Sequence, residues 1–334
     1  MTGKDAYARA GVSQRRADAA VAALVGHLSR IDPGRASRVV PLPGHYASVI
    51  RVDERLGVAM ATDGVRTKMI VAERLGRFDT IGIDCVAMNV NDLVCVGAEP
   101  IALLDFILCR EADPDVCDQI GAGLRRGAEL AGIEIPGGEI AQVGDAVAGW
   151  ELAGSAVGLV ALDAIVRGDR VEPGDALIGL PSSGLHSNGY TLARSALADL
   201  PLDDDRLGRP LGEVLLEPTR IYVRAILELL ASSADVRGLA HITGDGLNNL
   251  LRLAAKVGYE IGDPLPVPPV FDLIQRLGRV SDDEMHEVFN MGCGFCCVVA
   301  AADEATALEV LCRHHPDARR IGSATADAGR VARA

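Results

Sequence analysis

The chain has 334 residues, which predicts two domains, because one hydrophobic core rarely extends beyond about 250–300 residues. Its formal net charge is −13, only 3% of its residues are aromatic, and no basic stripe is present, so nucleic-acid binding is disfavoured. An acidic protein that handles an anionic substrate needs a local cationic pocket or a metal. No apolar run reaches the length of a membrane-spanning helix, and residues 1–16 lack the apolar core of a signal peptide. We therefore expect no membrane partner and a cytoplasmic location.

The cysteine pattern does not favour a metal site. Cys293 and Cys296 form a single C-x-x-C motif inside an apolar run that predicts a buried strand. A structural zinc site would need a second ligand pair at fitting spacing, and none is evident nearby. We interpret the eight cysteines as reduced thiols of the core.

The N-terminal stretch predicts one helix and one hairpin. Ser13 is suited to cap a helix whose apolar residues at 21, 24, 25 and 28 share one face, and residues 32–34 end that helix. A loop at 41–46 then leads into a hairpin with strands at about 47–52 and 57–61. His45 in this loop either contacts a ligand or is solvated.

Residues 58–111 carry the densest group of chemically active side chains. The pattern predicts helices at about 67–75 and 84–96 and a strand at 101–109. The polar residues at the edges of these apolar runs are Asp63, Lys68, Asp84, Asn91 and Asp92. Asp84 and Asn91 are seven residues apart and share one helix face. Carboxylates beside a lysine suit a polyphosphate held through Mg²⁺, whereas the alternative is that each aspartate caps a turn and Lys68 is solvated.

The rest of the first half predicts further α/β structure. A helix should begin at Asp113-Pro114 and end at Gly132. We interpret 135–142 as a glycine turn in which the backbone can approach a ligand closely. A strand is predicted at 152–162, and the turn-rich residues 168–175 indicate a domain boundary.

The second half predicts a strand, a turn and a helix around 176–190. A turn of small residues between a strand and a helix directs backbone N–H groups toward an anion, although no Walker A motif is present. Further predicted elements are helices at 218–230, 247–257, 270–277 and 303–314, a small-residue turn at 241–246, a loop at 263–269 and a strand within 289–299.

Eight short blocks, in order from Tyr7 to about Val299, carry a family resemblance. They are YARAGV, ATDGVRTK, DTIGIDCVAMNVNDLVCVGAEPIALLDF, GGEIAQ, SSGLHSNGY, EPTRIYV, HITGDG and EMHEVFNMGCGF. Together they resemble the aminoimidazole ribonucleotide synthetase family, also called phosphoribosylformylglycinamidine cyclo-ligases. The resemblance implies an ATP-dependent ring closure of formylglycinamidine ribonucleotide to aminoimidazole ribonucleotide, a step of purine synthesis.

The same resemblance implies the architecture. The fold class is α/β (α+β) with two domains, and ATP binds at the seam between them. The N-terminal domain, residues 1–167, has a mixed sheet that joins its twin's in a homodimer. The C-terminal domain, residues 168–334, is a second α/β domain.

Site roles also follow from the resemblance. The implied Mg²⁺ ligands are Asp63, Asp84, Asp92 and Glu139. The implied ATP-binding or pocket residues are Asp63, Gly64, Thr67, Lys68, Asp84, Asn91, Gly137, Gly138, Glu139, Ser183, Gly184, Ser187 and Asn188. The implied catalytic residues are Lys68, which meets the phosphates, and His186 and His241, which move protons during ring closure. The alternative for His241 is a hydrogen-bonded histidine that holds its loop.

Several residues depart from the family pattern. Arg66 and Asp245 replace glycines, Ala8 replaces a lysine and Ser13 an aspartate, and the loop PGHYAS is closer to the archaeal form. If the glycine replaced by Arg66 has a positive φ, a side chain there costs about 1–2 kcal/mol. Two other functions therefore stay open. One is a paralogue that phosphorylates another amide-like substrate, and the other is a non-catalytic nucleotide-binding dimer.

Overall fold

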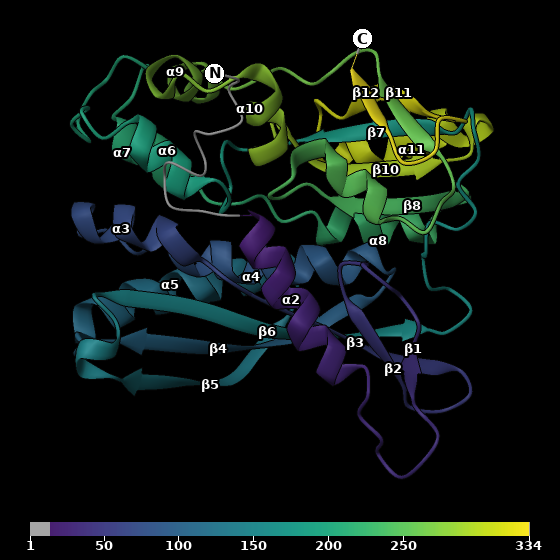
Figure 1. Ribbon diagram of the computed structural model, residues 1–334, viewed down its shortest axis with the longest axis horizontal. Coiled ribbons are helices and arrows are strands. Elements are labelled where there is room, and N and C mark those ends of the chain that lie inside the picture. The colour runs from purple at the N-terminus through teal and green to yellow at the C-terminus, as the bar shows by residue number, and fades with distance from the viewer. Residues whose placement is uncertain (1–13, 334) are drawn as a thin grey trace.

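The computed structural model describes residues 14–333, so the YARAGV block and Ser13 lie outside the described residues. Two six-stranded sheets, one in each half of the chain, are separated by a layer of helices (Figure 1). Each sheet is antiparallel except for one parallel pair at an edge. The predicted mixed α/β architecture is therefore confirmed. None of the described helices is long and apolar enough to cross a membrane.

The N-terminal sheet has the strand order β1-β2-β3-β6-β4-β5. Its strands are β1 (Val39–Val40), β2 (Ser48–Arg51), β3 (Leu56–Gly64), β4 (Glu99–Cys109), β5 (Glu134–Gln142) and β6 (Trp150–Ala161). The accompanying helices are α2 (Gln14–Leu28), η1 (Arg66–Lys68), α3 (Met69–Leu75), α4 (Ile81–Cys95), α5 (Pro114–Ala131) and η2 (Gly144–Ala146). The predicted hairpin and the helices at 67–75, 84–96 and 114–131 are confirmed. Asp113 accepts hydrogen bonds from the first turn of α5, and Gly132 ends that helix at φ +74°.

Helix α4 is buried over almost its whole length and packs on α5 and on the sheet. Gly82 permits the close crossing of α4 and α5, since a Cβ there would strike the backbone of Leu124. A Cβ at Gly154 of β6 would lie 3.0 Å from the side chains of Asn89 and Cys85. These close approaches fix α4 against the sheet, so its polar side chains project at defined positions toward the C-terminal half.

No helix within residues 14–333 covers the other face of the N-terminal sheet (Figure 1). Met60, Leu104 and Phe106 point to this open face and are 36%, 51% and 43% exposed. Their strand neighbours Ala59 and Leu103 point to the α4 side and are buried. Helix α2 also has its expected apolar stripe, but the stripe is exposed rather than packed on the core.

The C-terminal sheet has the order β12-β9-β11-β7-β10-β8. Its strands are β7 (Ala176–Pro181), β8 (Val236–His241), β9 (Gly258–Ile261), β10 (Cys293–Val299), β11 (Arg319–Thr325) and β12 (Val331–Arg333). Its helices are α6 (Tyr190–Ala196), α7 (Leu211–Leu216), α8 (Val223–Ala231), η3 (Gly246–Arg252), α9 (Pro269–Gly278), α10 (Asp282–Val288), η4 (Ala301–Asp303) and α11 (Glu304–His314).

Three predicted elements are wrong. Residues 135–142 form edge strand β5 rather than a glycine turn, and the register shift near Pro136 accommodates the missing N–H. The helix expected from Pro218 begins at Val223. The helix expected over 247–257 is a shorter 3₁₀ segment, η3, that ends at Arg252.

Candidate functional site

A buried ion pair links η1 to α4 at the seam between the two halves. The Lys68 ammonium lies 2.7 Å from Asp84 Oδ2, and neither side chain is exposed. Lys68 Nζ also donates to the carbonyl oxygens of Glu217 at 2.7 Å and His186 at 3.2 Å. Burial lowers the pKa of Lys68, and the neighbouring Asp84 carboxylate opposes that shift. The ammonium is therefore committed to protein partners.

Asp84 and Asn91 together hold the segment 217–222. Asp84 Oδ1 accepts from Thr219 N at 2.8 Å and from Thr219 Oγ1 at 2.6 Å. Asn91 Nδ2 donates to the Arg220 carbonyl at 2.9 Å, and Asn91 Oδ1 accepts from Tyr222 N at 3.0 Å. The predicted shared helix face is confirmed by these contacts. The same contacts hold 217–222 outside regular secondary structure, and α8 begins only at Val223.

Lys68, Asp84 and Asn91 thus make their contacts within the protein. Their polar groups face the protein's own segment 217–222, with no exposed atoms on Lys68, Asp84 or Asn91 that a metal or phosphate could reach. They join the two halves of the chain and position the seam.

His241 on β8 forms a second link across the seam. Its Nδ1 lies 2.8 Å from Asp92 Oδ1, and its Nε2 lies 3.4 Å from Asn91 Nδ2. Since Asn91 Oδ1 already accepts from Tyr222, the Asn91 amide must donate to Nε2. His241 therefore carries its proton on Nδ1 and donates it to Asp92. Burial raises the pKa of Asp92, and the hydrogen bond from His241 opposes the rise.

This geometry fits the alternative interpretation of His241 as a histidine that holds its loop. The side chain is fully buried and both ring nitrogens have partners, Asp92 and Asn91. Asp92 differs from Asp84 because 18% of its side chain is exposed. Its carboxylate thus keeps access to a ligand at the seam.

The turn 182–189 contains a second buried histidine. His186 has φ +61°, and its Nε2 accepts from Ser183 N at 3.2 Å. Its Nδ1 is buried and has no hydrogen-bond partner. Burial lowers the pKa of His186 well below its usual value, with further lowering from His241, Lys68 and Arg220, so the ring is neutral at pH 7. A neutral ring with one uncommitted N–H can exchange a proton with a group bound beside it.

The other residues expected in this turn are anchored to both halves. Ser183 Oγ donates to the Pro218 carbonyl at 2.6 Å, and Ser187 Oγ lies 3.4 Å from Thr219 Oγ1. Asn188 Nδ2 lies 3.9 Å from Met88 Sδ on α4. Gly184 adopts φ +145°, which favours glycine. The structure thus brings this turn to the end of the seam formed by α4.

Asp63 lies at the end of β3 on the α4 side of the sheet. Asn89 fixes its backbone through hydrogen bonds to both Asp63 N and Asp63 O. Asp63 Oδ1 accepts from Gly64 N at 2.8 Å and from Arg66 Nη2 at 2.7 Å. Thr67 Oγ1 is 3.4 Å from Thr191 Oγ1 of α6. Asp63 is 17% exposed in its side chain, so it resembles Asp92 in keeping access to a ligand.

Both residues that replace family glycines, Arg66 and Asp245, have left-handed backbone conformations. Arg66 has φ +61° and Asp245 has φ +77°. Glu151 stabilises the left-handed conformation of Arg66, because Glu151 Oε1 accepts a hydrogen bond from Arg66 N at 3.0 Å. Burial raises the pKa of Glu151, and the hydrogen bond from Arg66 opposes the rise. The Arg66 side chain is 63% exposed and contacts Asp63, so it does not fill the interior of the seam.

Glu139 lies apart from the aspartates. The register places Asp63, Gly154, Asp105 and Gly138 in one row across β3, β6, β4 and β5 on the α4 side. Glu139 follows Gly138 and therefore points to the open face. With neighbouring strands about 4.8 Å apart, β3 and β5 are about 14 Å apart.

The four predicted metal ligands do not lie together within the described part of one chain. Asp84 is sealed by Lys68, and Glu139 is on the other face of the sheet. Within residues 14–333, no group of three or more His, Cys, Asp or Glu side chains is arranged to hold a metal ion. Gly137 and Gly138 belong to edge strand β5 with Glu139 and do not reach the seam.

Two residues that contribute contacts to the candidate site were not predicted from the sequence. Thr219 belongs to the EPTRIYV block and is the direct partner of Asp84, but nothing in its spacing connects it to a helix 135 residues earlier. Glu151 stands at the start of an ordinary strand and gives no signal of its contact with Arg66.

The loop 41–46 is clamped from the C-terminal half. Arg252 Nε and Nη2 donate to the carbonyl oxygens of Gly44 and His45, and its guanidinium lies 4.2 Å from the Tyr46 ring centre. His45 Nδ1 accepts from Tyr46 N at 3.0 Å. Burial, with the nearby Arg252 and Arg167, lowers the pKa of His45 to about 4. His45 is thus a neutral, packed residue rather than a solvated one.

We expect this histidine to make the fold acid-sensitive. Its folded pKa is below its unfolded value near 6.5, so the unfolded chain takes up the proton first and stability falls as pH drops from 6.5 to 4. The shift corresponds to about 3 kcal/mol. Urea unfolding of the protein and of His45→Asn at pH 7 and pH 4.5 should show a smaller pH-dependent loss in the variant. Equal losses would contradict the assignment.

Each half of the chain is built on a six-stranded sheet, and the two halves meet at the seam between α4 and the segment 217–222. This arrangement defines a class of two-domain proteins. The family model "AIR synthase related protein, N-terminal domain" matches residues 44–160, and "AIR synthase related protein, C-terminal domain" matches residues 172–333. Among curated proteins, the phosphoribosylformylglycinamidine cyclo-ligase of Methanothermobacter thermautotrophicus is 46% identical over 317 residues, 93% of this chain and 92% of the relative. That of Pyrococcus horikoshii is 46% identical over 92% of both chains. The chain belongs to the phosphoribosylformylglycinamidine cyclo-ligase family.

Solved structures of more distant proteins share the fold. Hydrogenase maturation protein HypE in complex with ATP has a TM-score of 0.63 and 22% identity, over 85% of this chain and 83% of that chain. ThiL complexed with AMPPCP and TMP has a TM-score of 0.62 and 15% identity, over 87% and 88%. At these identities the similarity establishes the architecture alone.

Proposed function

We propose that the protein catalyses the ATP-dependent ring closure of formylglycinamidine ribonucleotide to aminoimidazole ribonucleotide, with release of ADP and phosphate. The observation that carries the proposal is the similarity to curated cyclo-ligases at 46% identity along more than nine-tenths of both chains. The partly exposed carboxylates of Asp63 and Asp92 would supply the acidic groups of the site.

The reaction requires that the reacting groups be positioned and that the charge of the phosphates be neutralised. A formamide oxygen is a poor leaving group, so transfer of the γ-phosphoryl group of ATP to it gives an iminophosphate. The substrate's own amidine nitrogen then attacks the iminophosphate carbon, and phosphate leaves. The protein needs to align the phosphoryl group and the amidine and to balance the charge between them.

The residues at the seam fit these tasks in distinct ways. The neutral His186 would relay a proton during ring closure, and its buried Nδ1 without a hydrogen-bond partner supports this role. Ser183, Gly184, Ser187 and Asn188 shape the pocket that receives substrate or phosphate. Lys68, Asp84 and His241 hold the two halves of the chain together at the seam, as positioning residues.

We further propose that ATP binds there with Mg²⁺. Magnesium bound to nucleotides commonly takes one or two carboxylates together with phosphate oxygens, and Asp63 and Asp92 supply two partly exposed carboxylates. When bound, the metal would neutralise phosphate charge. Support for ATP comes from two structures of the same fold, one in complex with ATP and the other with AMPPCP.

The proposed reaction is tested by ADP release with and without formylglycinamidine ribonucleotide. Ring closure predicts substrate-dependent ADP release and an absorbing imidazole product. The paralogue predicts ATP binding without turnover of this substrate. A non-catalytic dimer that binds a partner chain in place of a nucleotide predicts no ATP-dependent thermal shift, whereas a ligand at 100 times its Kd stabilises a protein by about 2.7 kcal/mol. A large gain of cyclisation in Arg66→Gly would favour the paralogue.

We infer that the working form is a homodimer joined through the open face of the N-terminal sheet. Apolar side chains exposed together on a sheet are typical of an interface, and Met60, Leu104 and Phe106 share this face. A location in the cytoplasm agrees with free, mostly buried cysteines, which persist in a reducing compartment. The proposed partners are thus the substrate, ATP and a second copy of the chain.

The dimer is expected to dissociate when charge is placed on the open face. Phe106→Glu should shift the protein from a 70 kDa species toward the 35 kDa monomer, twofold lower in mass, in sedimentation velocity. The matched control is Leu277→Glu, at an exposed leucine of α9 in the C-terminal half, and this variant should remain dimeric. Dissociation by both variants, or by neither, would contradict this interface.

A further inference from the structure

Strand β10 carries two cysteines whose sulfur atoms are in contact. Cys293 Sγ lies 3.5 Å from Cys296 Sγ, and both thiols are free. A C-x-x-C spacing in a regular strand would place them on opposite faces, because side chains alternate along a strand. The register against β7 shifts at Gly294, and the two cysteines lie opposite Pro181 and Gly179. This β-bulge therefore puts both thiols on one face of the sheet.

The spacing permits a disulfide if the backbone moves. Residues two register positions apart on a strand have Cα atoms about 6.6–6.8 Å apart, and disulfides bridge Cα separations of up to about 6.8 Å. The two sulfurs would have to close from 3.5 Å to about 2.05 Å. Glycines on both sides of Cys293 allow the bulge to yield, since Gly292 has φ +94° and Gly294 is the extra residue. Bond formation therefore draws in this part of β10.

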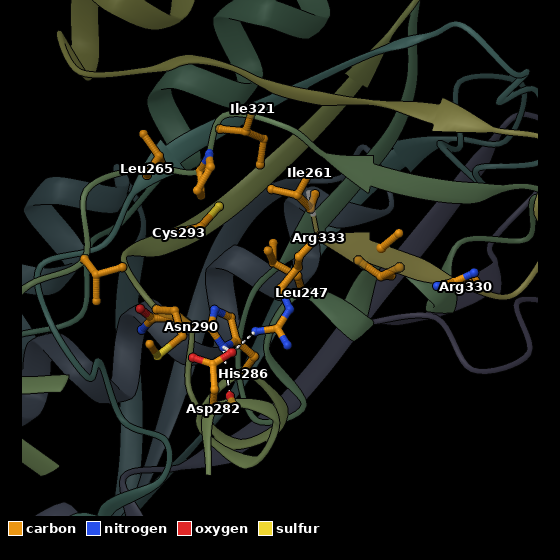
Figure 2. A pocket seen from close by; sticks show the side chains of 15 residues that line it. Leu247, Ile261, Leu265, Asp282, His286, Asn290, Cys293, Ile321, Arg330 and Arg333 are labelled. Carbon is orange, nitrogen blue, oxygen red and sulfur yellow. Dashed lines mark hydrogen bonds and ion pairs between the residues drawn. The ribbon is translucent and has the colours of Figure 1, made fainter. Parts of the chain in front are cut away.

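A small oxidant can reach one of the two thiols. Cys293 is 4% exposed and lines a cavity of about 560 Å³ beside the loop 263–269 (Figure 2). Hydrogen peroxide needs to contact only one atom, so a narrow opening is sufficient. Cys296 is fully buried and does not line the cavity. Burial raises the pKa of Cys296 well above its usual value, so Cys296 keeps its proton while Cys293 meets the oxidant.

Gly294 connects the thiol pair to His186. A Cβ on Gly294 would collide with Tyr222 Oη and with His186 Cε1, so both rings lie directly against the bulge. Ser182 N donates to the Gly292 carbonyl at 2.9 Å, which ties the start of the turn that carries His186 to the same bulge. A movement of the bulge therefore moves His186.

We propose that Cys293 and Cys296 are a peroxide-sensitive pair that closes into an intrachain disulfide and displaces His186. The Cys293 sulfur attacks one peroxide oxygen, the O–O bond breaks, and the products are a sulfenic acid on Cys293 and one water. The Cys296 sulfur then attacks the Cys293 sulfur, the S–O bond breaks, and the hydroxyl leaves with the Cys296 proton as a second water. Two thiols are oxidised and one peroxide is reduced. A dithiol reverses the step by thiol–disulfide exchange.

The test treats the full, reduced chain with hydrogen peroxide and then unfolds it in iodoacetamide for mass spectrometry. We expect the peptide that contains residues 293–296 to have lost two hydrogens and to resist alkylation at both cysteines until dithiothreitol is added. Hydrogen exchange in 182–189 should change with the disulfide. Substrate-dependent ADP release should fall at least about 10-fold and return with dithiothreitol, since a misplacement of about 1 Å can cost about 10²-fold.

Only the loss of ADP release rests on the proposed function. The mass and hydrogen-exchange measurements need no turnover, so the failure of one proposal is distinguishable from the failure of the other. Alkylation of Cys293 after peroxide treatment would overturn the disulfide. A disulfide that leaves hydrogen exchange in 182–189 unchanged would overturn its connection to His186.

Two variants separate this pair from general thiol oxidation. Cys293→Ser cannot form the disulfide and should keep its ADP release after peroxide treatment. Its hydroxyl can still donate to the Phe295 carbonyl, which Cys293 Sγ approaches at 3.6 Å. The matched control is Cys117→Ser, at a half-buried thiol of α5, and this variant should respond to peroxide as the unmodified protein does. Equal peroxide inactivation of Cys293→Ser would place the sensitive group elsewhere and refute the proposal.

Discussion

Replacing Lys68 by methionine is expected to destabilise the fold by about 3–5 kcal/mol, the usual cost of leaving one buried charge without its partner. Asp84 would keep its hydrogen bonds from Thr219 but would lose the ammonium 2.7 Å away in a site with no exposure. Urea unfolding followed by circular dichroism measures the change. Because the pair spans η1, α4 and the segment 217–222, we expect the loss to appear in the cooperative unfolding of both halves.

The controls separate charge from packing. Lys68→Met/Asp84→Leu removes both charges and should recover a large part of the lost stability, since apolar replacement of a buried pair is often tolerated. Arg77→Met removes a 45% exposed arginine with partners at 3.7 and 4.0 Å and should cost less than about 1 kcal/mol. A cost of that small size for Lys68→Met would show that the buried pair does not hold the seam.

The local structure around α4 was predictable because its signals are local. Apolar spacing defines the helix, and a separation of seven residues places Asp84 and Asn91 on one face. Their partners were not predictable in the same way. Thr219 and Tyr222 lie about 130 residues further along the chain, and only the packed fold brings them to α4. The sequence pattern thus indicated that Asp84 and Asn91 share a helix face, but not that both side chains bind a distant segment of the same chain.

The misassigned strand β5 shows a different limit. Glycine, proline and glutamate in 135–142 favour a turn by local propensity, but an edge strand pairs on one side only and tolerates them. The family resemblance grouped Glu139 with Asp63 as an implied Mg²⁺ ligand. Strand alternation puts Glu139 on the open face instead, which no local pattern could indicate without the sheet order.

If Asp63 contacts the nucleotide as proposed, Asp63→Asn should lower kcat/KM for formylglycinamidine ribonucleotide about 10²–10³-fold, as for other groups that balance charge in a transition state. The fold should be little affected. Asn89 holds the Asp63 backbone from both sides, and the ion pair with Arg66 involves an arginine that is 63% exposed. The amide of asparagine can still accept from Gly64 N, so the change removes mainly the charge.

The matched control is Asp145→Asn, which neutralises a 94% exposed aspartate that also pairs with an arginine, Arg110. It should leave kcat/KM unchanged. Substrate-dependent ADP release and the thermal midpoint are measured for both variants, because a loss of activity accompanied by unfolding would not report on the site. Full activity in a well-folded Asp63→Asn would remove Asp63 from the proposed nucleotide site. Since Asp84 is paired with Lys68 and Glu139 lies on the other face of the sheet, Asp92 would then be the one predicted metal ligand still available at the seam.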